Sequence, residues 1–350
     1  MVILATLVGA GFASGKEIFS FFFVYGKIGV IGIIISSFII SLVIYKVFKI
    51  CSANNIQTYQ EFCGTIGNFR LKSNSKLCQY FNSRLAELLN SIVNLLLLVT
   101  FYIMISGFSS LMRQEFGINE LCGSMIIVFL CYITFQKNIN GLIQISNYLV
   151  PVLILFIIYV ATKDMCITQN YQNIFGTIDY AIIPGVPQYA GIIKSTLYAC
   201  YNCIILIPIL IPLKNTVKGN KNILKISVIS FIAITILSLA IFNLLLQGNE
   251  DIYKLEMPII AIVKKYGKFY LNFYITIIGI SIFTSAVSTG YSFLNNLSKS
   301  TKCYKRNTIL MCVTAIAVSQ VSFSSMVNLL YPVLGIFGIL EVILLFSGRF

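Results

Sequence analysis

Long apolar runs separated by short polar loops set the main constraint on this chain. Of its 350 residues, 58% are hydrophobic and 10% are charged, and the mean hydropathy is +0.89. A run of about 20 apolar residues crosses a bilayer as a helix, and lipid offers no partner to an unpaired backbone group. The sequence therefore predicts an all-α integral membrane protein, and it excludes a soluble domain that carries one apolar helix.

Ten transmembrane helices are predicted. Their ranges are 1–25, 28–48, 84–112, 121–136, 141–162, 189–213, 223–247, 268–297, 307–326 and 327–347. The polar stretch between residues 51 and 85 is expected to hold a short surface helix. The stretch Met257–Lys265 resembles an interfacial amphipathic turn.

The long connection at 163–188 divides the helices into two sets of five. An odd number of helices in each half turns the second half over, as in transporters with inverted repeats. We therefore expect one transmembrane domain, 1–350, with a first repeat at 1–162 and a second at about 163–350. A break in the first helix then predicts a break in the sixth. The sixth is polar for its depth at Tyr198-Ala-Cys-Tyr-Asn202, but this stretch has no glycine.

The net charge of +14 indicates orientation in the membrane rather than binding to nucleic acid. Loops after the second, fourth, sixth and eighth helices, with the C-terminal tail, hold about twice as many Lys and Arg residues as the opposite loops. We expect a multi-pass protein of the plasma membrane with both termini in the cytoplasm. Its expected partners are the lipid bilayer and a small-molecule solute, and the sequence does not indicate an oligomeric state.

The first apolar run contains the stretch from Val8 to Glu17, Val-Gly-Ala-Gly-Phe-Ala-Ser-Gly-Lys-Glu. Each of its three glycines weakens a helix by about 1 kcal/mol relative to alanine. An ionisable pair, Lys16-Glu17, follows directly, and ionisable residues inside a membrane are costly and usually functional. The combination predicts a discontinuous helix whose free backbone groups bind an ion or a substrate. Gly11-xxx-Gly15 is also compatible with close helix packing.

Hydroxyl side chains share one face of the predicted eighth helix. Ser281, Thr284, Ser285 and Ser288 follow the i, i+3, i+4, i+7 spacing. With backbone carbonyls, hydroxyls suit a hard monovalent cation such as sodium, although serine and threonine in membrane helices also bond to their own i−4 carbonyl.

Two carboxylates lie within predicted spans, Glu17 and Glu341. Each is a candidate proton carrier or gate, because a charge inside the membrane needs a partner or a function. Glu17 has an obvious candidate partner in the adjacent Lys16, and a gate or structural role is favoured for it over that of a proton carrier.

Residues for other kinds of chemistry are sparse. The chain has ten cysteines and no histidine, and Cys200 and Cys203 are interpreted as small buried residues of an apolar helix. An embedded enzyme would need positioned acids, bases or metal ligands, and a channel would need a filter-like loop. We keep these two classes as alternatives, and we expect no cofactor apart from sodium as a coupling ion.

The first-helix sequence Gly9-Ala-Gly-Phe-Ala-Ser-Gly-Lys-Glu17, followed by Phe21-Phe-Phe-Val-Tyr-Gly26-Lys-Ile-Gly29-Val-Ile-Gly32, resembles the start of the YkvI-like membrane proteins. These are regarded as amino-acid permeases near the LeuT-fold, or amino acid–polyamine–organocation, superfamily. Tyr198-Ala-Cys-Tyr-Asn202 is similar to the sixth-helix motif of that family. The resemblance implies five-plus-five inverted repeats, a substrate between broken helices one and six, and sodium between helices one and eight.

Site residues follow from the resemblance by position. The substrate-binding set would be Gly9, Ala10, Gly11, Phe12, Ala13, Ser14, Gly15, Tyr198, Tyr201 and Asn202. The sodium ligands would be the carbonyls of Ala5, Val8 and Ser281 and the hydroxyls of Thr284 and Ser285.

The expected function is a secondary active transporter that imports an amino acid or a related compound with sodium by alternating access. The helix at 141–162 has no central lysine, which proton-coupled relatives can carry, and this favours sodium. A proton-coupled permease that uses Glu17 or Glu341 is the alternative.

Overall fold

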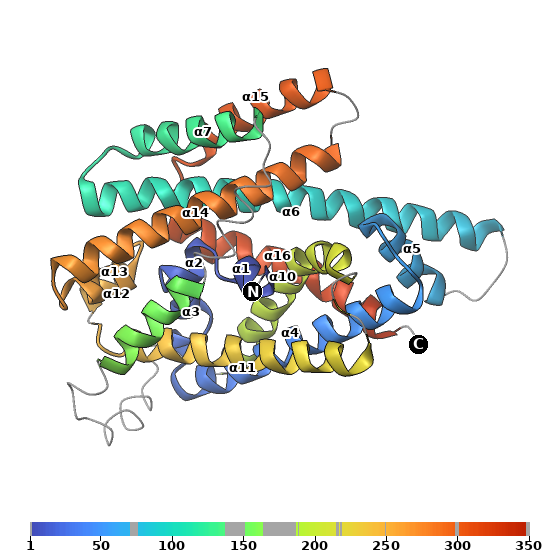
Figure 1. The fold of residues 1–350 in the computed structure, drawn as a ribbon, viewed down its shortest axis with the longest axis horizontal. Coiled ribbons are helices and arrows are strands. Elements are labelled where there is room, and N and C mark those ends of the chain that lie inside the picture. Colours follow the sequence, from blue (N-terminus) through green and yellow to red (C-terminus); the bar gives the residue numbers. More distant parts are fainter. Residues whose placement is uncertain are drawn as a thin grey trace.

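The computed structural model describes residues 2–70, 76–136, 151–163, 187, 189–214, 217, 219–248, 250–297 and 301–347. All regular secondary structure in these ranges is helical. Together with the apolar composition, this confirms an all-α, multi-pass membrane protein (Figure 1).

The first apolar run forms three short helices and one 3₁₀ turn: α1 (Val2–Leu7), α2 (Ala10–Ala13), α3 (Lys16–Phe21) and η1 (Phe23–Tyr25). The helices that follow are α4 (Gly26–Ala53), α5 (Tyr59–Arg70), α6 (Lys76–Phe116), α7 (Glu120–Gln136) and an apolar helix at Pro151–Lys163. The remaining helices are α10 (Ala190–Leu213), α11 (Asn220–Leu245), α12 (Glu250–Lys254), α13 (Pro258–Lys264), α14 (Lys268–Leu297), α15 (Thr301–Val318) and α16 (Phe323–Ser347).

Six helical stretches are long and apolar enough to cross a membrane: Lys16–Ala53, Glu87–Phe116, Ala190–Leu213, Asn220–Leu245, Lys268–Leu297 and Phe323–Ser347. Shorter apolar helices lie at Glu120–Gln136 and Pro151–Lys163. Helical structure occurs in all ten predicted ranges, although residues 141–150 of the fifth lie outside the described residues. The short helix predicted between residues 51 and 85 is confirmed as α5.

The predicted junction between the last two helices was wrong by several residues. α15 ends at Val318, where the bond from Val321 N to Val318 O replaces the α-helical pattern. α16 starts at Phe323, and the hydroxyl of Ser322 accepts a hydrogen bond from Ser325 N at 3.3 Å. Serine is a favoured N-cap, because its side chain satisfies a free amide of the first turn.

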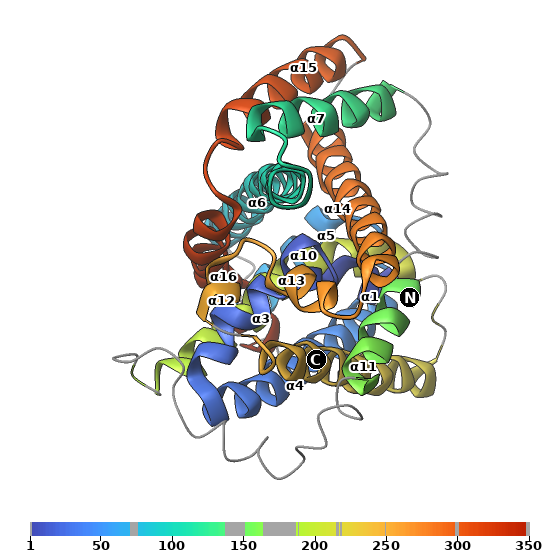
Figure 2. The ribbon, with the colours of Figure 1, turned by 90° about the vertical axis from the view of Figure 1, so that its left-hand side faces the viewer.

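α10 lies in the middle of the molecule, as two perpendicular views show (Figures 1 and 2). It packs against α16, α4 and α1, while α6 and α14 form a second closely packed pair. Two glycines of α16 allow its contact with α10. A Cβ atom at Gly335 would lie 2.6 Å from Leu197 O, and one at Gly338 would lie 2.2 Å from Cys200 O. Small residues let membrane helices approach this closely.

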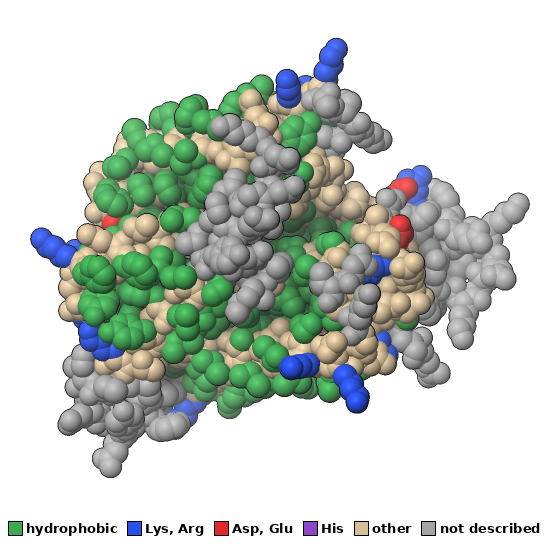
Figure 3. Space-filling view, in the orientation of Figure 1, with side chains coloured by type: hydrophobic (Ala, Val, Ile, Leu, Met, Phe, Trp, Pro, Cys, Tyr) green, Lys and Arg blue, Asp and Glu red, His purple; other side chains and the backbone are tan. Residues whose placement is uncertain are grey.

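Apolar side chains cover much of the face shown in Figure 3, and Lys and Arg side chains lie mainly near its edge. Large exposed apolar residues occur on several helices, among them Phe38 on α4, Phe129 on α7 and Leu329 on α16. Apolar exposure on so many helices fits contact with lipid.

Two expectations were wrong. The sixth predicted span is not broken, because α10 is helical throughout Ala190–Leu213. Its polar stretch has no glycine, and Asn202 Nδ2 donates to Tyr198 O within the same helix at 2.9 Å. The expected interfacial turn at Met257–Lys265 instead forms α13, whose Ile259 and Ile260 are fully buried in the protein.

Candidate functional site

The first apolar run is interrupted between α1 and α2. α1 ends at Leu7, Val8 lies outside both helices, and Gly9 is extended with φ −90° and ψ −169°. Helix termini leave amide and carbonyl groups that need partners other than the helix itself. The predicted discontinuous first helix is therefore confirmed, and it is almost completely buried.

A second interruption separates α2 from α3. Gly15 has a left-handed backbone with φ +81°, and a Cβ atom there would also lie 2.5 Å from Ile259 Cγ1. The hydroxyl of Ser14 donates to Gly11 O at 3.1 Å and accepts from Lys16 N at 3.3 Å. Glycine is the residue that adopts this conformation without strain, so Gly15 sets the direction in which α3 leaves the break.

Glu17, in the first turn of α3, is buried at the centre of the site. Its carboxylate accepts a hydrogen bond from the hydroxyl of Tyr201 on α10, and Tyr331 of α16 stacks on the ring of Tyr201. The side chain folds back over α2, and a Cβ atom at Gly11 would lie 2.2 Å from Glu17 Oε1. The glycine at position 11 therefore provides room for the carboxylate.

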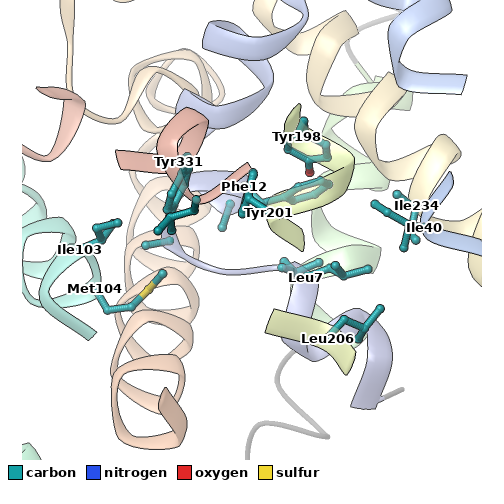
Figure 4. Close-up of a cluster of buried hydrophobic side chains, with 14 of the residues drawn as sticks. Leu7, Phe12, Ile40, Ile103, Met104, Tyr198, Tyr201, Leu206, Ile234 and Tyr331 are labelled. Atoms are coloured by element: carbon teal, nitrogen blue, oxygen red, sulfur yellow. The ribbon is translucent and has the colours of Figure 1, made fainter. Parts of the chain in front are cut away.

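Aromatic rings surround this carboxylate. The rings of Tyr201 and Tyr331 stack with centroids 4.6 Å apart, and Tyr198 meets Tyr201 edge-on at 5.3 Å. Phe21 of α3 lies 5.5 Å from Tyr198. Figure 4 shows Phe12 of α2 beside the three tyrosines. The structure thus joins the predicted stretch at residues 9–15 and the predicted residue Glu17 to Tyr198 and Tyr201 of α10, and it adds Tyr331.

A small cavity adjoins the break. It measures about 10 Å³ and is lined by Leu4, Leu7, Val8, Phe12, Ile40, Tyr198, Ile234 and Leu237. This volume is close to the smallest that holds one water molecule. The lining is apolar apart from the tyrosine hydroxyl, and Phe12 and Tyr198 belong to both the cavity and the ring cluster. A larger solute would need the surrounding helices to move apart.

Lys16 does not pair with Glu17, so that expectation was wrong. Its ammonium donates to the carbonyls of Tyr253, at 3.3 Å, and Leu255, at 3.0 Å. The left-handed turn at Gly15 starts a new helix, and the Lys16 side chain leaves that helix toward α12. Lys16 is buried although its neighbours are carbonyl dipoles rather than a carboxylate in direct contact.

The segment α12–α13 covers the second interruption. Ile259 N donates to Ser14 O at 3.1 Å, in addition to the two bonds of Lys16. The same segment is fixed to α6, because Met257 N donates to Gln114 Oε1 at 3.0 Å and Gln114 Nε2 donates to Met257 O at 3.3 Å. The break is therefore held closed on this side by hydrogen bonds.

The residues predicted to bind sodium lie in α1, in the interruption after it, and in α14. Ala5 is in α1, Val8 is in the interruption, and Ser281, Thr284 and Ser285 are in α14. α14 packs against α2, and the hydroxyl of Tyr274 donates to Ala13 O. α1 and α14 are not among the closely packed helix pairs of the described residues, and the five-residue set stays a prediction.

Within α14, Ser281 and Thr284 are buried and Ser288 is exposed. Thr284 Oγ1 donates to Ser281 O at 3.0 Å, so this hydroxyl bonds to a carbonyl of its own helix instead of an ion. Ser281 Oγ, in contrast, is buried and has no hydrogen-bond partner among the described residues. Buried polar groups are usually satisfied, so this hydroxyl remains open to another ligand.

Glu341 forms a second buried acidic site, away from the break. Tyr59 of α5 donates its hydroxyl to Glu341 Oε1 at 2.9 Å. The other carboxylate oxygen, Oε2, is buried without a hydrogen-bond partner among the described residues. Sequence reasoning identified Glu341 but missed Tyr59, because nothing local links two residues so far apart in the chain.

The described side chains provide no group of three or more His, Cys, Asp or Glu residues that could hold a metal ion. The chemistry available at the break is therefore that of backbone groups, one carboxylate, tyrosine hydroxyls and aromatic rings. This set can bind a small solute, but it lacks the paired acids of a typical hydrolytic centre.

Comparisons with known proteins agree with this architecture. No family model matches the chain. The chain is 25% identical over 336 residues to the uncharacterized membrane protein YkvI of Bacillus subtilis (strain 168), a match that covers 95% of this chain and 90% of YkvI. It is 21% identical over 337 residues to the uncharacterized protein YyaD of the same organism, covering 96% and 91% of the two chains.

Among solved structures, the fold is similar to that of a manganese transporter from Eremococcus coleocola. A mutant of that protein aligns with a TM-score of 0.57 at 12% identity, covering 96% of this chain and 74% of the transporter. Its complex with an aromatic bis-isothiourea substituted compound aligns with a TM-score of 0.53 at 13% identity and the same coverage. The chain is thus a multi-pass membrane protein that has the fold of a transporter and is similar over nearly its whole length to YkvI.

Proposed function

We propose that this chain is a secondary active transporter that moves a small organic solute, an amino acid or a related compound, by alternating access at the broken first helix. The observation that carries the proposal is the buried break itself. Backbone at membrane depth that leaves its helix is tolerated where it lines a cavity or is buried in protein. Here it lies beside a carboxylate and three tyrosines. The transporter fold of the solved relatives supports the same function.

The closed form of the site suggests how access alternates. The α12–α13 segment covers one side of the break, and the cavity on the side of α1 is small. Binding from either side then requires one layer of helices to separate while the other stays packed. Two inverted repeats, 1–162 and about 163–350, would provide the two moving halves.

Manganese is the solute named for the fold neighbour. An organic solute is favoured for this chain, since the described residues contain no cluster of three metal-ligating side chains. Aromatic rings and an apolar cavity also suit an organic molecule better than a hydrated metal ion.

Sodium is the proposed coupling ion, bound by the carbonyls of Ala5, Val8 and Ser281 and the hydroxyls of Thr284 and Ser285. The unsatisfied buried hydroxyl of Ser281 supports a ligand at this face of α14. Proton coupling is the second candidate. It is supported by Glu341, whose buried Oε2 atom has no hydrogen-bond partner among the described residues, as expected of a group that binds and releases a proton.

Both termini are proposed to lie in the cytoplasm, which puts α12–α13 outside. Cysteine in place of the exposed Lys268 should react with an impermeant maleimide added to intact cells. Cysteine in place of the exposed Lys221, at the start of α11, should react only after the cells are opened. The reverse pattern would contradict the charge-based orientation.

Uptake into proteoliposomes tests the function. Purified protein should give saturable accumulation of a radiolabelled solute from an amino-acid panel, dependent on an inward sodium gradient and abolished by a sodium ionophore. A proton gradient that drives uptake equally well without sodium would select the second candidate. Uptake that never saturates would indicate a channel instead.

A further inference from the structure

The carboxyl group of Glu17 is buried, and the groups described around it are neutral. The hydroxyl of Tyr201 donates a hydrogen bond to it. The adjacent Lys16 points to α12 instead, and no described Lys or Arg side chain forms an ion pair with Glu17. Buried charges are normally paired, because desolvation without a counter-charge is costly. The natural complement at this position is a positive charge.

The rings beside the carboxylate fit the same complement. Tyr201, whose hydroxyl donates to Glu17, stacks on Tyr331 with ring centroids 4.6 Å apart, and Tyr198 packs edge-on against Tyr201 at 5.3 Å. The face of an aromatic ring attracts an ammonium group within about 6 Å of its centroid. A carboxylate among several rings is thus a suitable environment for an organic cation.

The apolar cavity can bind the uncharged part of the solute. Phe12 and Tyr198 line it, and they also belong to the ring cluster that surrounds Glu17. Leu4, Leu7 and Leu237 also line the cavity. A solute with a charged head and an apolar body could therefore bind with its head at Glu17 and its body toward the cavity.

We propose that the solute bound at the break carries a protonated amine, which pairs with Glu17 beside the stacked rings of Tyr201 and Tyr331, and an apolar group that enters the cavity. The proposal rests on the transporter function and specifies its substrate class. A divalent metal ion fits less well, because one carboxylate and neutral hydroxyls supply too little negative charge. An organic acid without an amine would place two like charges together.

Binding of matched ligands to the purified full-length chain tests the proposal. Leucine amide and phenylalanine amide keep the protonated amine and lack a carboxylate, whereas the N-acetyl forms of the same amino acids keep the carboxylate and lack the amine. In a thermal-shift titration, at least one amide should stabilise the wild type at millimolar concentration, and both N-acetyl acids should not. Stabilisation by the N-acetyl acids, by manganese chloride alone, or by none of these ligands would overturn the proposal.

Two pairs of variants locate the charge. Glu17→Gln keeps the size of the side chain and should weaken amide binding at least tenfold, whereas Glu87→Gln, which removes an exposed carboxylate of α6, should leave it within about twofold. Tyr331→Leu removes a ring and should weaken binding by about tenfold, while Tyr331→Phe keeps the ring and should weaken it less. Unchanged amide affinity in both Glu17→Gln and Tyr331→Leu would overturn the assignment.

Binding and transport can fail separately. Amide binding that depends on Glu17, without uptake in proteoliposomes, would refute the transporter function and leave the ligand class standing. Uptake of a solute that has no amine, unaffected by Glu17→Gln, would refute the ligand class and leave the transporter function standing.

Discussion

The broken first helix and the unbroken α10 face each other across the site, and they contribute to it in opposite ways. The broken helix contributes free backbone groups and space for side chains. Gly9 and Gly15 interrupt it, and Gly11 leaves space beside it for the carboxylate of Glu17. α10 keeps its helix from Ala190 to Leu213, even with prolines at 208 and 212, and offers side chains. The stretch Tyr198–Asn202 shows that polar residues alone do not break a helix when a polar side chain can form a hydrogen bond within that helix.

The same difference suggests which part moves. α10 is fitted tightly to α16, where Gly335 and Gly338 lie directly against its carbonyls. The short helices α1, α2 and α3 are joined by non-helical residues, and a few hydrogen bonds connect them to α12–α13, α14 and α10. We expect α10 and α16 to move as one body, and the broken helix to change shape around the solute.

A substitution that makes the first helix continuous, as α10 is, should have the largest effect on uptake. Gly11→Leu replaces a helix-weakening residue with a strong helix former and forces a side chain into the space of the Glu17 carboxylate. Uptake should fall by roughly a hundredfold or more, while the protein still inserts into the membrane.

Gly11→Ala and Gly279→Ala form a matched control pair for this prediction. A Cβ atom at Gly279 meets Leu111 Cδ2 at an ordinary 3.6 Å, so that variant should transport normally, whereas Gly11→Ala should not. Normal uptake by Gly11→Leu would mean that the break is not part of the transport site.

Removing a proposed ligand of the coupling ion should have the next largest effect on uptake. Thr284→Ala and Ser285→Ala each remove one proposed sodium ligand, which costs about 1–3 kcal/mol by analogy with an unmet buried polar partner. The sodium concentration for half-maximal uptake should therefore rise roughly five- to hundredfold. Ser288→Ala, on the exposed part of the same helical face, is the control and should change little.

Proton coupling predicts the reverse for this set of variants. Uptake would then be indifferent to replacement of sodium by choline and to Thr284→Ala. Its pH dependence would disappear in Glu341→Gln or Glu17→Gln. Measuring uptake against sodium and against pH in the same variants separates the two mechanisms.

Releasing the α12–α13 segment from the break should have a smaller effect. Lys16→Met keeps the length of the side chain and removes both bonds to Tyr253 O and Leu255 O. A cysteine introduced at the buried Met257 should then react about five- to tenfold faster with a maleimide, since the closed form loses about 1 kcal/mol.

The matching control for Lys16→Met is Lys254→Met. Lys254 lies on α12 with 74% of its side chain exposed, in a surface pair with Asp251. Exposed pairs contribute little, so the labelling rate should not change. Equal rates in the two variants would mean that Lys16 does not hold the segment closed.

How much of the site the sequence predicted depends on the range of the interaction. The break at residues 8–15 was predictable because glycine acts on the local backbone. The partners of Glu17 and Glu341 were not, since Tyr201 and Tyr59 reach them across 184 and 282 residues of sequence. Pairing Lys16 with Glu17 failed for a related reason, because adjacent residues of a helix point in different directions. The break in α10 was expected only because an inverted repeat would place it opposite the break in the first helix. No residue of α10 itself indicated it, and the expectation was wrong.

Access to the break from both sides of the membrane tests the central claim most directly. Ser14→Cys is a conservative change at a fully buried position between α2 and α3, and it can be followed after the native cysteines are replaced. In proteoliposomes, an impermeant maleimide should label Cys at position 14 from either side in turn, and the transported solute at saturating concentration should slow both reactions. Labelling from one side only, or labelling that the solute does not affect, would contradict a transporter that works by alternating access at this break.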